Sequence, residues 1–262
     1  MFSLYLDCRQ EEKDQLVAEL WDRGSLGITE TDSPVGSCVL RAFFDEDGKA
    51  SDLQHDFAPW SARFEQEEPR DWISEARTKL EPMCIGKRFF LVPEWREDAA
   101  PPGRFRIEVN PGMAFGTGAH ESTQLCLEAL ESAVRPGMAV LDVGSGSGIL
   151  AVAAGLLGAE RVIACDIDPV AVELACQPLS FIGTVDAVRR RSFDLAVANI
   201  SPEAIIALAP DLAGVLRPGG VLIVSGFEIA EIMGVQTALA SHGARTQSSL
   251  TKRTWAALVV SI

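Results

Sequence analysis

Apolar and polar residues alternate in two different patterns along this chain of 262 residues, and the change falls near position 120. Beyond that position, apolar runs of strand length alternate with segments in which apolar residues recur at helical spacing. We expect strands at 139–143, 162–166, 193–199, 221–225 and 254–260, and helices at 122–133, 148–157, 169–176, 202–216 and 228–242. Nearly continuous apolar strands between helices predict a doubly wound, mostly parallel α/β sheet of the Rossmann-like type. Such a sheet binds its ligand at the carboxyl ends of the strands.

The first third of the chain carries shorter segments with a different order. Alternation typical of strands and spacing typical of helices predict strand, helix, strand, strand, helix, strand at 2–7, 11–21, 26–30, 38–44, 49–57 and 61–67. This order is typical of a small α+β domain of the ferredoxin-like type.

A helical segment from Glu67 to Leu80, ended by Pro82, joins the two patterns. Two further strands are expected at 88–92 and 105–109, and a loop rich in proline separates them. We therefore expect a small domain at 1–66, a linker helix at 67–82 and a large domain at 83–262.

The composition is that of an ordinary soluble globular protein, with 47% hydrophobic and 23% charged residues. A net charge of −14 argues against stable binding of nucleic acid. No apolar run is long enough to span a bilayer, and charged residues come too early for a signal peptide. The six cysteines are scattered and only three histidines are present, which favours buried thiols without a metal site. We expect a cytoplasmic monomer.

The most informative segment is a glycine-rich turn between the strand at 139–143 and the helix at 148–157. It reads Asp142-x-Gly-x-Gly-x-Gly148, and the next apolar run ends in a second acid, Asp166. Gly144 and Gly146 would let the backbone approach a nucleoside-type ligand, and Asp166 would accept hydrogen bonds from both ribose hydroxyls. The turn could also be a tight turn without a ligand.

The spacing of this turn also distinguishes between cofactors. A dinucleotide fingerprint requires a glycine at position 149, which is Ile149 here. Asp142 at the entrance of the helix would repel a pyrophosphate. S-adenosylmethionine carries a sulfonium and an ammonium instead of phosphates, so an acid there is favourable. The turn therefore favours a methyltransferase over an NAD-dependent oxidoreductase.

Two further polar residues are expected at the same edge of the sheet. Asn199 ends the strand at 193–199, where it could contact cofactor or substrate, or simply cap the following helix. Asp186 is expected near the carboxyl end of the third strand of the large sheet, where it could contact the cofactor. It could also be an ordinary turn residue, because short polar turns often contain such an acid.

A second glycine-containing segment, Asn110 to Thr123, precedes the glycine turn. Its position predicts a lid over the methionine end of the cofactor, with Thr123 entering the following helix. His120 in this segment could accept a proton during the reaction or only shape the loop.

Together these segments resemble the PrmA family, the methyltransferases of large-subunit ribosomal protein eleven. The segments that carry the resemblance are 110–123, 140–150, 165–169, 197–200 and the closing Trp-Ala-Ala-Leu-Val-Val from Trp255. The resemblance covers 66–262 well, and the first domain mainly in layout and length.

The resemblance implies that Thr123, Gly144, Asp166 and Asn199 are cofactor-binding positions. It also implies methylation of lysine side chains and an α-amine by S-adenosylmethionine. The small domain would hold a ribosomal protein that is free of the ribosome or transiently bound to it.

Three departures from the family pattern concern the substrate more than the cofactor. The family's His-Pro-Thr-Thr reads His-Glu-Ser-Thr from His120, and its Asn-Ile-Leu reads Asn-Ile-Ser from Asn199. The interval from Asp166 to Asn199 is also shorter, with the loss after Cys176. A methyltransferase of another protein or of a small amine, or a cofactor-binding module without activity, therefore stay open as alternatives.

Overall fold

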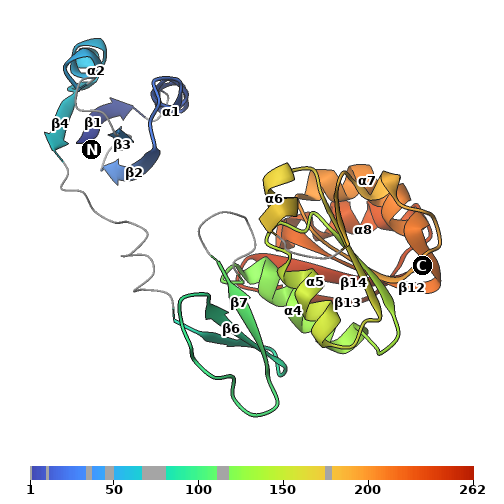
Figure 1. Ribbon diagram of the computed structural model, residues 1–262. Helices are drawn as coiled ribbons and strands as arrows, with labels where there is room; N and C mark the ends of the chain where they lie inside the picture. Colours follow the sequence, from blue (N-terminus) through green and yellow to red (C-terminus); the bar gives the residue numbers. More distant parts are fainter. Residues whose placement is uncertain are drawn as a thin grey trace. The chain divides into compact units, whose positions relative to one another are not determined.

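The computed structural model of the protein describes residues 2–9, 12–33, 37–44, 50–66, 81–110, 118–174 and 179–262. The chain divides into two compact units, Met1–Ala76 and Arg77–Ile262 (Figure 1). The helix expected at 67–80 lies outside the described residues. Each unit is described by itself below.

The first unit is a four-stranded sheet with two helices. Its elements are β1 (Phe2–Arg9), α1 (Lys13–Asp22), β2 (Gly27–Ser33), β3 (Ser37–Phe44), α2 (Ala50–Asp56), the short 3-10 helix η2 (Ala58–Trp60) and β4 (Arg63–Gln66). The strand order is β2-β3-β1-β4, and every neighbouring pair is antiparallel. This order confirms the predicted ferredoxin-like domain.

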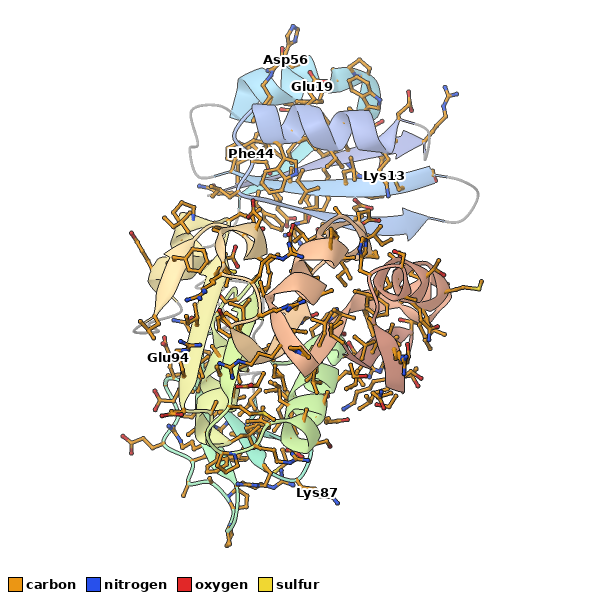
Figure 2. The ribbon with its side chains drawn as sticks, turned by 90° about the vertical axis from the view of Figure 1, so that its right-hand side faces the viewer. Lys13, Glu19, Phe44, Asp56, Lys87 and Glu94 are labelled. Atoms are coloured by element: carbon orange, nitrogen blue, oxygen red, sulfur yellow. The ribbon has the colours of Figure 1, made fainter. Side chains whose placement is uncertain are left out.

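Strand alternation gives this unit its own core. Every second residue of β1 and β3 is buried, and these side chains pack with Leu16, Leu20 and Leu53 from the helices. Phe44 lies on the sheet face that the helices cover (Figure 2). At the surface, the Arg23 guanidinium pairs with both Glu19 and Asp56 and so connects α1 to α2.

The second unit contains a seven-stranded sheet. Its strands are β8 (Ala139–Val143), β9 (Arg161–Asp166), β10 (Ser180–Ile182), β11 (Phe193–Asn199), β12 (Leu216–Glu228), β13 (Arg245–Lys252) and β14 (Trp255–Ser261). They lie in the order β10-β9-β8-β11-β12-β14-β13. The first five are parallel, whereas β14 is antiparallel to both of its neighbours. The mostly parallel sheet confirms the prediction from the apolar runs.

Helices cover both faces of this sheet (Figure 1). They are α4 (Glu121–Ala133), α5 (Ile149–Leu156), α6 (Pro169–Leu174), α7 (Pro202–Val215) and α8 (Ile232–Ala240). Neighbouring residues of a strand point to opposite faces, so Val140 packs in the core with α4 and α5, and Leu141 in the core with α7 and α8. Both cores are apolar, which explains the continuous apolar strands.

A second, three-stranded sheet extends the core on the α4 and α5 side. It consists of β5 (Met83–Ile85), β6 (Phe89–Pro93) and β7 (Phe105–Val109), in the order β5-β6-β7. Phe89 and Ile107 share one buried cluster with Leu130 of α4. The Glu131 carboxylate also accepts hydrogen bonds from the backbone of Lys87 and Arg88 at 3.0 and 2.7 Å. These contacts attach the small sheet to the helix that enters the ligand site.

The structure corrects the sequence prediction near the carboxyl terminus. The helix expected at 228–242 begins later, because β12 continues to Glu228 and the 3-10 helix η4 (Ile229–Glu231) precedes α8. A capping box between Glu228 and Glu231 marks this boundary. Strands β10 and β13 were not predicted, since β10 has three residues and β13 is a polar, largely exposed edge strand.

Candidate functional site

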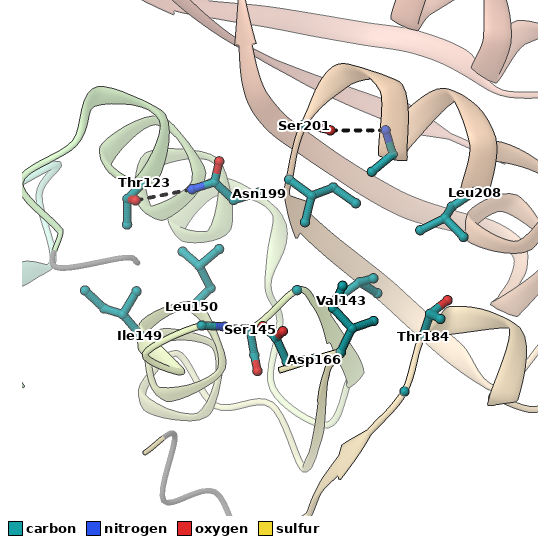
Figure 3. A pocket seen from close by; sticks show the side chains of 16 residues that line it. Thr123, Val143, Ser145, Ile149, Leu150, Asp166, Thr184, Asn199, Ser201 and Leu208 are labelled. Carbon is teal, nitrogen blue, oxygen red and sulfur yellow. Dashed lines mark hydrogen bonds between the residues drawn. The ribbon is translucent and has the colours of Figure 1, made fainter. Parts of the chain in front are cut away.

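A cavity of about 360 Å³ opens at the carboxyl ends of the parallel strands of the large sheet (Figure 3). This volume lies in the range of small-ligand sites. The wall is formed by Thr123, Val143, Gly144, Ser145, Gly146, Ile149, Leu150, Asp166, Ile167, Gly183, Thr184, Asn199, Ile200, Ser201, Ala204 and Leu208. Five candidates from the sequence are therefore brought together here: Thr123, Gly144, Gly146, Asp166 and Asn199.

The glycine turn after β8 has a backbone that only glycine adopts without strain. Gly144, Gly146 and Gly148 have φ angles of +70°, +51° and +75°. A Cβ on Gly144 would also lie 2.3 Å from Ile200 Cγ2, so a side chain would collide with the opposite wall. Backbone conformation and space together explain the alternating glycines of the motif.

The Asp166 carboxylate lies at the end of β9 and is held by two backbone donors. Its Oδ2 accepts from Gly146 N at 2.8 Å, and its Oδ1 accepts from Asp168 N at 3.0 Å. These bonds connect the glycine turn to the next strand end. They leave further lone pairs on both oxygens, because a carboxylate can accept about four hydrogen bonds.

Asn199 lies at the end of β11, across the cavity from the glycine turn. Its Nδ2 donates to Thr123 Oγ1 of α4 at 3.2 Å, which fixes the amide plane (Figure 3). Among the described residues, Asn199 Oδ1 is a buried acceptor without a hydrogen-bond partner. Such an acceptor is costly unless a ligand satisfies it.

Among the residues described, two hydroxyl groups in the cavity lining also lack a hydrogen-bond partner, as Asn199 Oδ1 does. Ser145 Oγ and Thr184 Oγ1 are buried and have no partner in the described part of the chain. Neither residue was predicted from the sequence. Thr184 follows β10, a strand that the sequence did not predict. Ser145 lies between Gly144 and Gly146, and the motif was interpreted from its glycines alone. Three buried polar atoms without partners in the described lining of one cavity indicate a polar ligand.

Asp142 was expected to contact the cofactor, but it is not among the residues of the cavity wall. Its side chain is completely buried behind the turn, where Oδ2 accepts from Ala151 N at 3.0 Å. Burial raises the pKa of Asp142 to about 7; the Ala151 hydrogen bond opposes this, and the charge of Asp166 adds to it. In the structure Asp142 therefore anchors the first turn of α5.

We expect Asp142→Asn to become more stable relative to the wild type as the pH rises from about 4 to 7. The folded-state pKa of about 7 lies above the ordinary value of 3.8, so the stability contributed by the acid is complete below that value. It is lost as the pH rises through 7, by up to about 1.4 kcal/mol per pH unit. Urea unfolding of both proteins across this range measures the difference; a constant difference would contradict the assignment.

His120 and Asp186 also lie outside the cavity wall. His120 is the N-cap of α4: its Nδ1 accepts from Ser122 N at 3.3 Å. Its ring packs edge-on against Trp255, with 4.4 Å between the centroids. Asp186 is exposed in the 3-10 helix η3 (Val185–Ala187), next to the wall residue Thr184. The lid expected in the segment 110–123 falls mostly on 111–117, outside the described residues.

The structure describes most of the interval from Asp166 to Asn199, which the sequence analysis singled out as short. It contains α6, β10 and η3, and residues 175–178 lie outside the described part. Across the described ranges, no three His, Cys, Asp or Glu side chains gather closely enough to hold a metal ion. No described helix has the length and apolar character that a bilayer crossing requires.

The sheet order with one reversed strand, the glycine turn and the acid at the next strand end define the fold of class I S-adenosylmethionine-dependent methyltransferases. The sequence profile described as "Ribosomal protein L11 methyltransferase (PrmA)" matches residues 2–262. The chain belongs to this family, which confirms the resemblance found in the sequence.

Individual relatives agree with this assignment. A ribosomal protein L11 methyltransferase of Symbiobacterium thermophilum is 44% identical over 68% of this chain and 61% of its own length. One of Pelobacter propionicus is 40% identical over 72% and 66%. A crystal structure of a ribosomal protein L11 methylase from Lactobacillus delbrueckii subsp. bulgaricus has a TM-score of 0.65 and 30% identity, covering 69% of this chain and 98% of that one. The matches thus span less than two thirds of the length of both curated relatives.

Proposed function

We propose that this chain transfers methyl groups from S-adenosylmethionine to amines of ribosomal protein L11, on lysine side chains, an α-amine or both. The observation that carries the proposal is the set of buried polar atoms without partners in the described lining of the cavity. Membership of the family and the names of the relatives support the choice of substrate.

The residues of the wall fit S-adenosylmethionine. We assign the ribose hydroxyls to Asp166, whose carboxylate has acceptor capacity left. The methionine end is assigned to the glycine turn, Thr123 and Asn199, and the adenine to the side of Thr184 and Leu208. When bound, this cofactor supplies a methyl group on a positively charged sulfur. We propose no resident metal.

The target amine must reach the methyl group neutral and aligned. Asn199 Oδ1 is held by the bond from Asn199 Nδ2 to Thr123 and can accept an N–H of that amine, which directs its lone pair. The apolar residue Ile200, next to Asn199, limits water on this side and favours the neutral amine. Asp166 is the only acid on the described wall and is already held by two N–H groups, so we assign the leaving proton to solvent.

The first unit is assigned to holding the protein substrate, since all cofactor candidates lie in the second unit. We propose a monomer that acts in the cytoplasm on L11 free of the ribosome or transiently bound to it. The departures at Ser122 and Ser201 leave another protein or a small amine as the second candidate substrate.

The test is incubation of the enzyme and labelled cofactor with a complete set of ribosomal proteins, followed by mass spectrometry. We expect label on L11 amines. Label on a different protein would show that the substrate is wrongly assigned, while the methyl-transfer reaction would stand. Absence of S-adenosylhomocysteine binding in calorimetry would reject the methyltransferase assignment itself.

Asp166→Ala should weaken S-adenosylhomocysteine binding about 10- to 100-fold, because a charge-assisted acceptor of about 1.5–3 kcal/mol is removed. Asp168→Ala is the matched control, since this neighbouring acid accepts from Val170 N in the next turn and is not among the described residues of the cavity wall. Calorimetry should show nearly unchanged affinity for the control. Equal losses in both variants would contradict the assignment of the ribose hydroxyls to Asp166.

Asn199→Ala should lower the rate of methyl transfer at saturating cofactor about 100-fold, with a smaller loss of cofactor affinity. Single-turnover kinetics and calorimetry measure the two effects separately. Ser201→Ala is the comparison variant in the same cavity lining, because Ser201 caps α7 through a bond from Ala204 N and tests whether disturbing this helix end alone slows the reaction. If Asn199→Ala reduces affinity and leaves the single-turnover rate normal, Asn199 is a cofactor contact alone.

A further inference from the structure

Two cysteine side chains face each other inside the first unit. Cys8 of β1 and Cys38 of β3 are direct partners in the antiparallel register, and their Sγ atoms are 3.0 Å apart. Opposed residues of antiparallel strands have Cα atoms about 4.5–5.5 Å apart, which lies within the range that a disulfide spans. Small rotations of the side chains are therefore enough to bring the sulfurs to bonding distance.

One of the two cysteines lies beside a cavity. A cavity of about 360 Å³ lies beside Cys8 and is walled by Asp7, Cys8, Arg9, Glu12, Ser37, Pro59 and Trp60. Both cysteines are buried, with Cys8 4% and Cys38 1% exposed, and Cys38 does not line this wall. A small reagent that enters the cavity therefore meets Cys8 first, and Cys38 is positioned directly behind it.

We propose that Cys8 and Cys38 form a reversible disulfide site whose oxidant is a low-molecular-weight disulfide. The Cys8 thiolate attacks one sulfur of the reagent, which forms a mixed disulfide and releases the first small thiol. Cys38 then attacks the Cys8 sulfur and releases the second small thiol. The two protein thiols lose two protons and two electrons in total, and the reagent is reduced to two thiols.

The surroundings of the pair determine how fast this exchange runs. Burial raises the pKa of the Cys8 thiol to about 12, and the hydrogen bond and charge of Cys38 add to this. Few thiolates are present at neutral pH, so the pair exchanges slowly with a low-molecular-weight disulfide. This distinguishes it from the exposed thiol of Cys84 in the second unit, which should react first.

The bond would have a structural consequence for the first unit. It would close the chain between β1 and β3 around α1 and β2, and so restrict the unfolded state. We expect the thermal unfolding midpoint of the first unit to rise by more than about 10 °C on oxidation. The site is independent of the proposed methyl transfer, because every readout is chemical or thermal.

The test treats the full chain with oxidised glutathione and maps peptides under non-reducing conditions. We expect glutathione on Cys84, a cross-linked peptide pair containing Cys8 and Cys38, and loss of that link with dithiothreitol. Free Cys8 and Cys38 thiols in a sample whose Cys84 is fully modified would overturn the proposal. So would glutathione that stays on Cys8 without transfer to Cys38.

Single variants test the order of attack. Cys38→Ala should accumulate glutathione on Cys8, because the resolving thiol is gone, whereas Cys8→Ala should leave Cys38 unmodified. Cys126→Ala is the matched control, since it removes a buried thiol of the second unit. It should still form the Cys8–Cys38 link. If Cys38 of Cys8→Ala acquires glutathione as fast as the link forms in the wild type, the reagent does not enter through Cys8, and the proposed order of attack is wrong.

Discussion

Adding a single methyl group at Gly144, as Gly144→Ala, should lower the affinity for S-adenosylhomocysteine by about 100-fold or more. The new Cβ would lie 2.3 Å from Ile200 Cγ2, and the φ angle of +70° is unfavourable for any residue with a side chain. The backbone of Ile200 is held in place, because its N donates to Ser225 O at 3.2 Å. Its backbone also packs directly on Gly226. Either the turn or the Ile200 side chain must therefore move, and both line the cavity.

Gly137→Ala is the matched control for this substitution. Gly137 has a similar φ angle of +84°, but a Cβ there would meet nothing within 4 Å. Both variants carry the same backbone cost of about 1–3 kcal/mol, and only Gly144→Ala adds the collision. Calorimetry and thermal unfolding on both proteins separate affinity from stability. Normal binding by Gly144→Ala, or equal loss in both, would mean that the crevice is wrongly assigned.

The sequence predicted the parts of the site that local backbone chemistry determines. Alternating glycines after an apolar run require a left-handed backbone, and the acid at the end of the next run follows from strand order. Gly144, Asp166 and Asn199 could therefore be placed at one edge of the sheet before the fold was known. Their roles in binding and catalysis stay predictions.

Other features depend on contacts that a linear pattern does not carry. Thr184 reaches the wall through β10, whose three residues are too few to show strand periodicity. Strand β13 is polar because one edge of the sheet faces solvent, so it lacks the apolar alternation that marks a strand. The position of Asp142 before the glycine turn suggested a contact with the cofactor. In the structure its side chain is buried behind the turn and accepts from Ala151 N of α5.

Removal of the first unit should abolish methylation of ribosomal protein L11 while cofactor binding persists. The two units have separate buried cores: one cluster lies wholly in the first unit, and the two others lie in the second. A chain of residues 77–262 should therefore bind S-adenosylhomocysteine with affinity within about threefold of the full chain. Its rate on the protein substrate should fall about 100-fold or more, since the tethering that raises the local concentration of target amines is lost.

The comparison of substrates makes this result interpretable. A short lysine peptide cannot use the first unit, so its slow methylation should be the same with and without residues 1–76. Equal peptide rates together with a lost L11 rate would locate substrate holding in the first unit. If both rates fall together, residues 1–76 maintain the catalytic unit itself. If the shortened chain modifies L11 at the full rate, the first unit has a regulatory or purely stabilising role. The second unit alone would then bind the protein substrate.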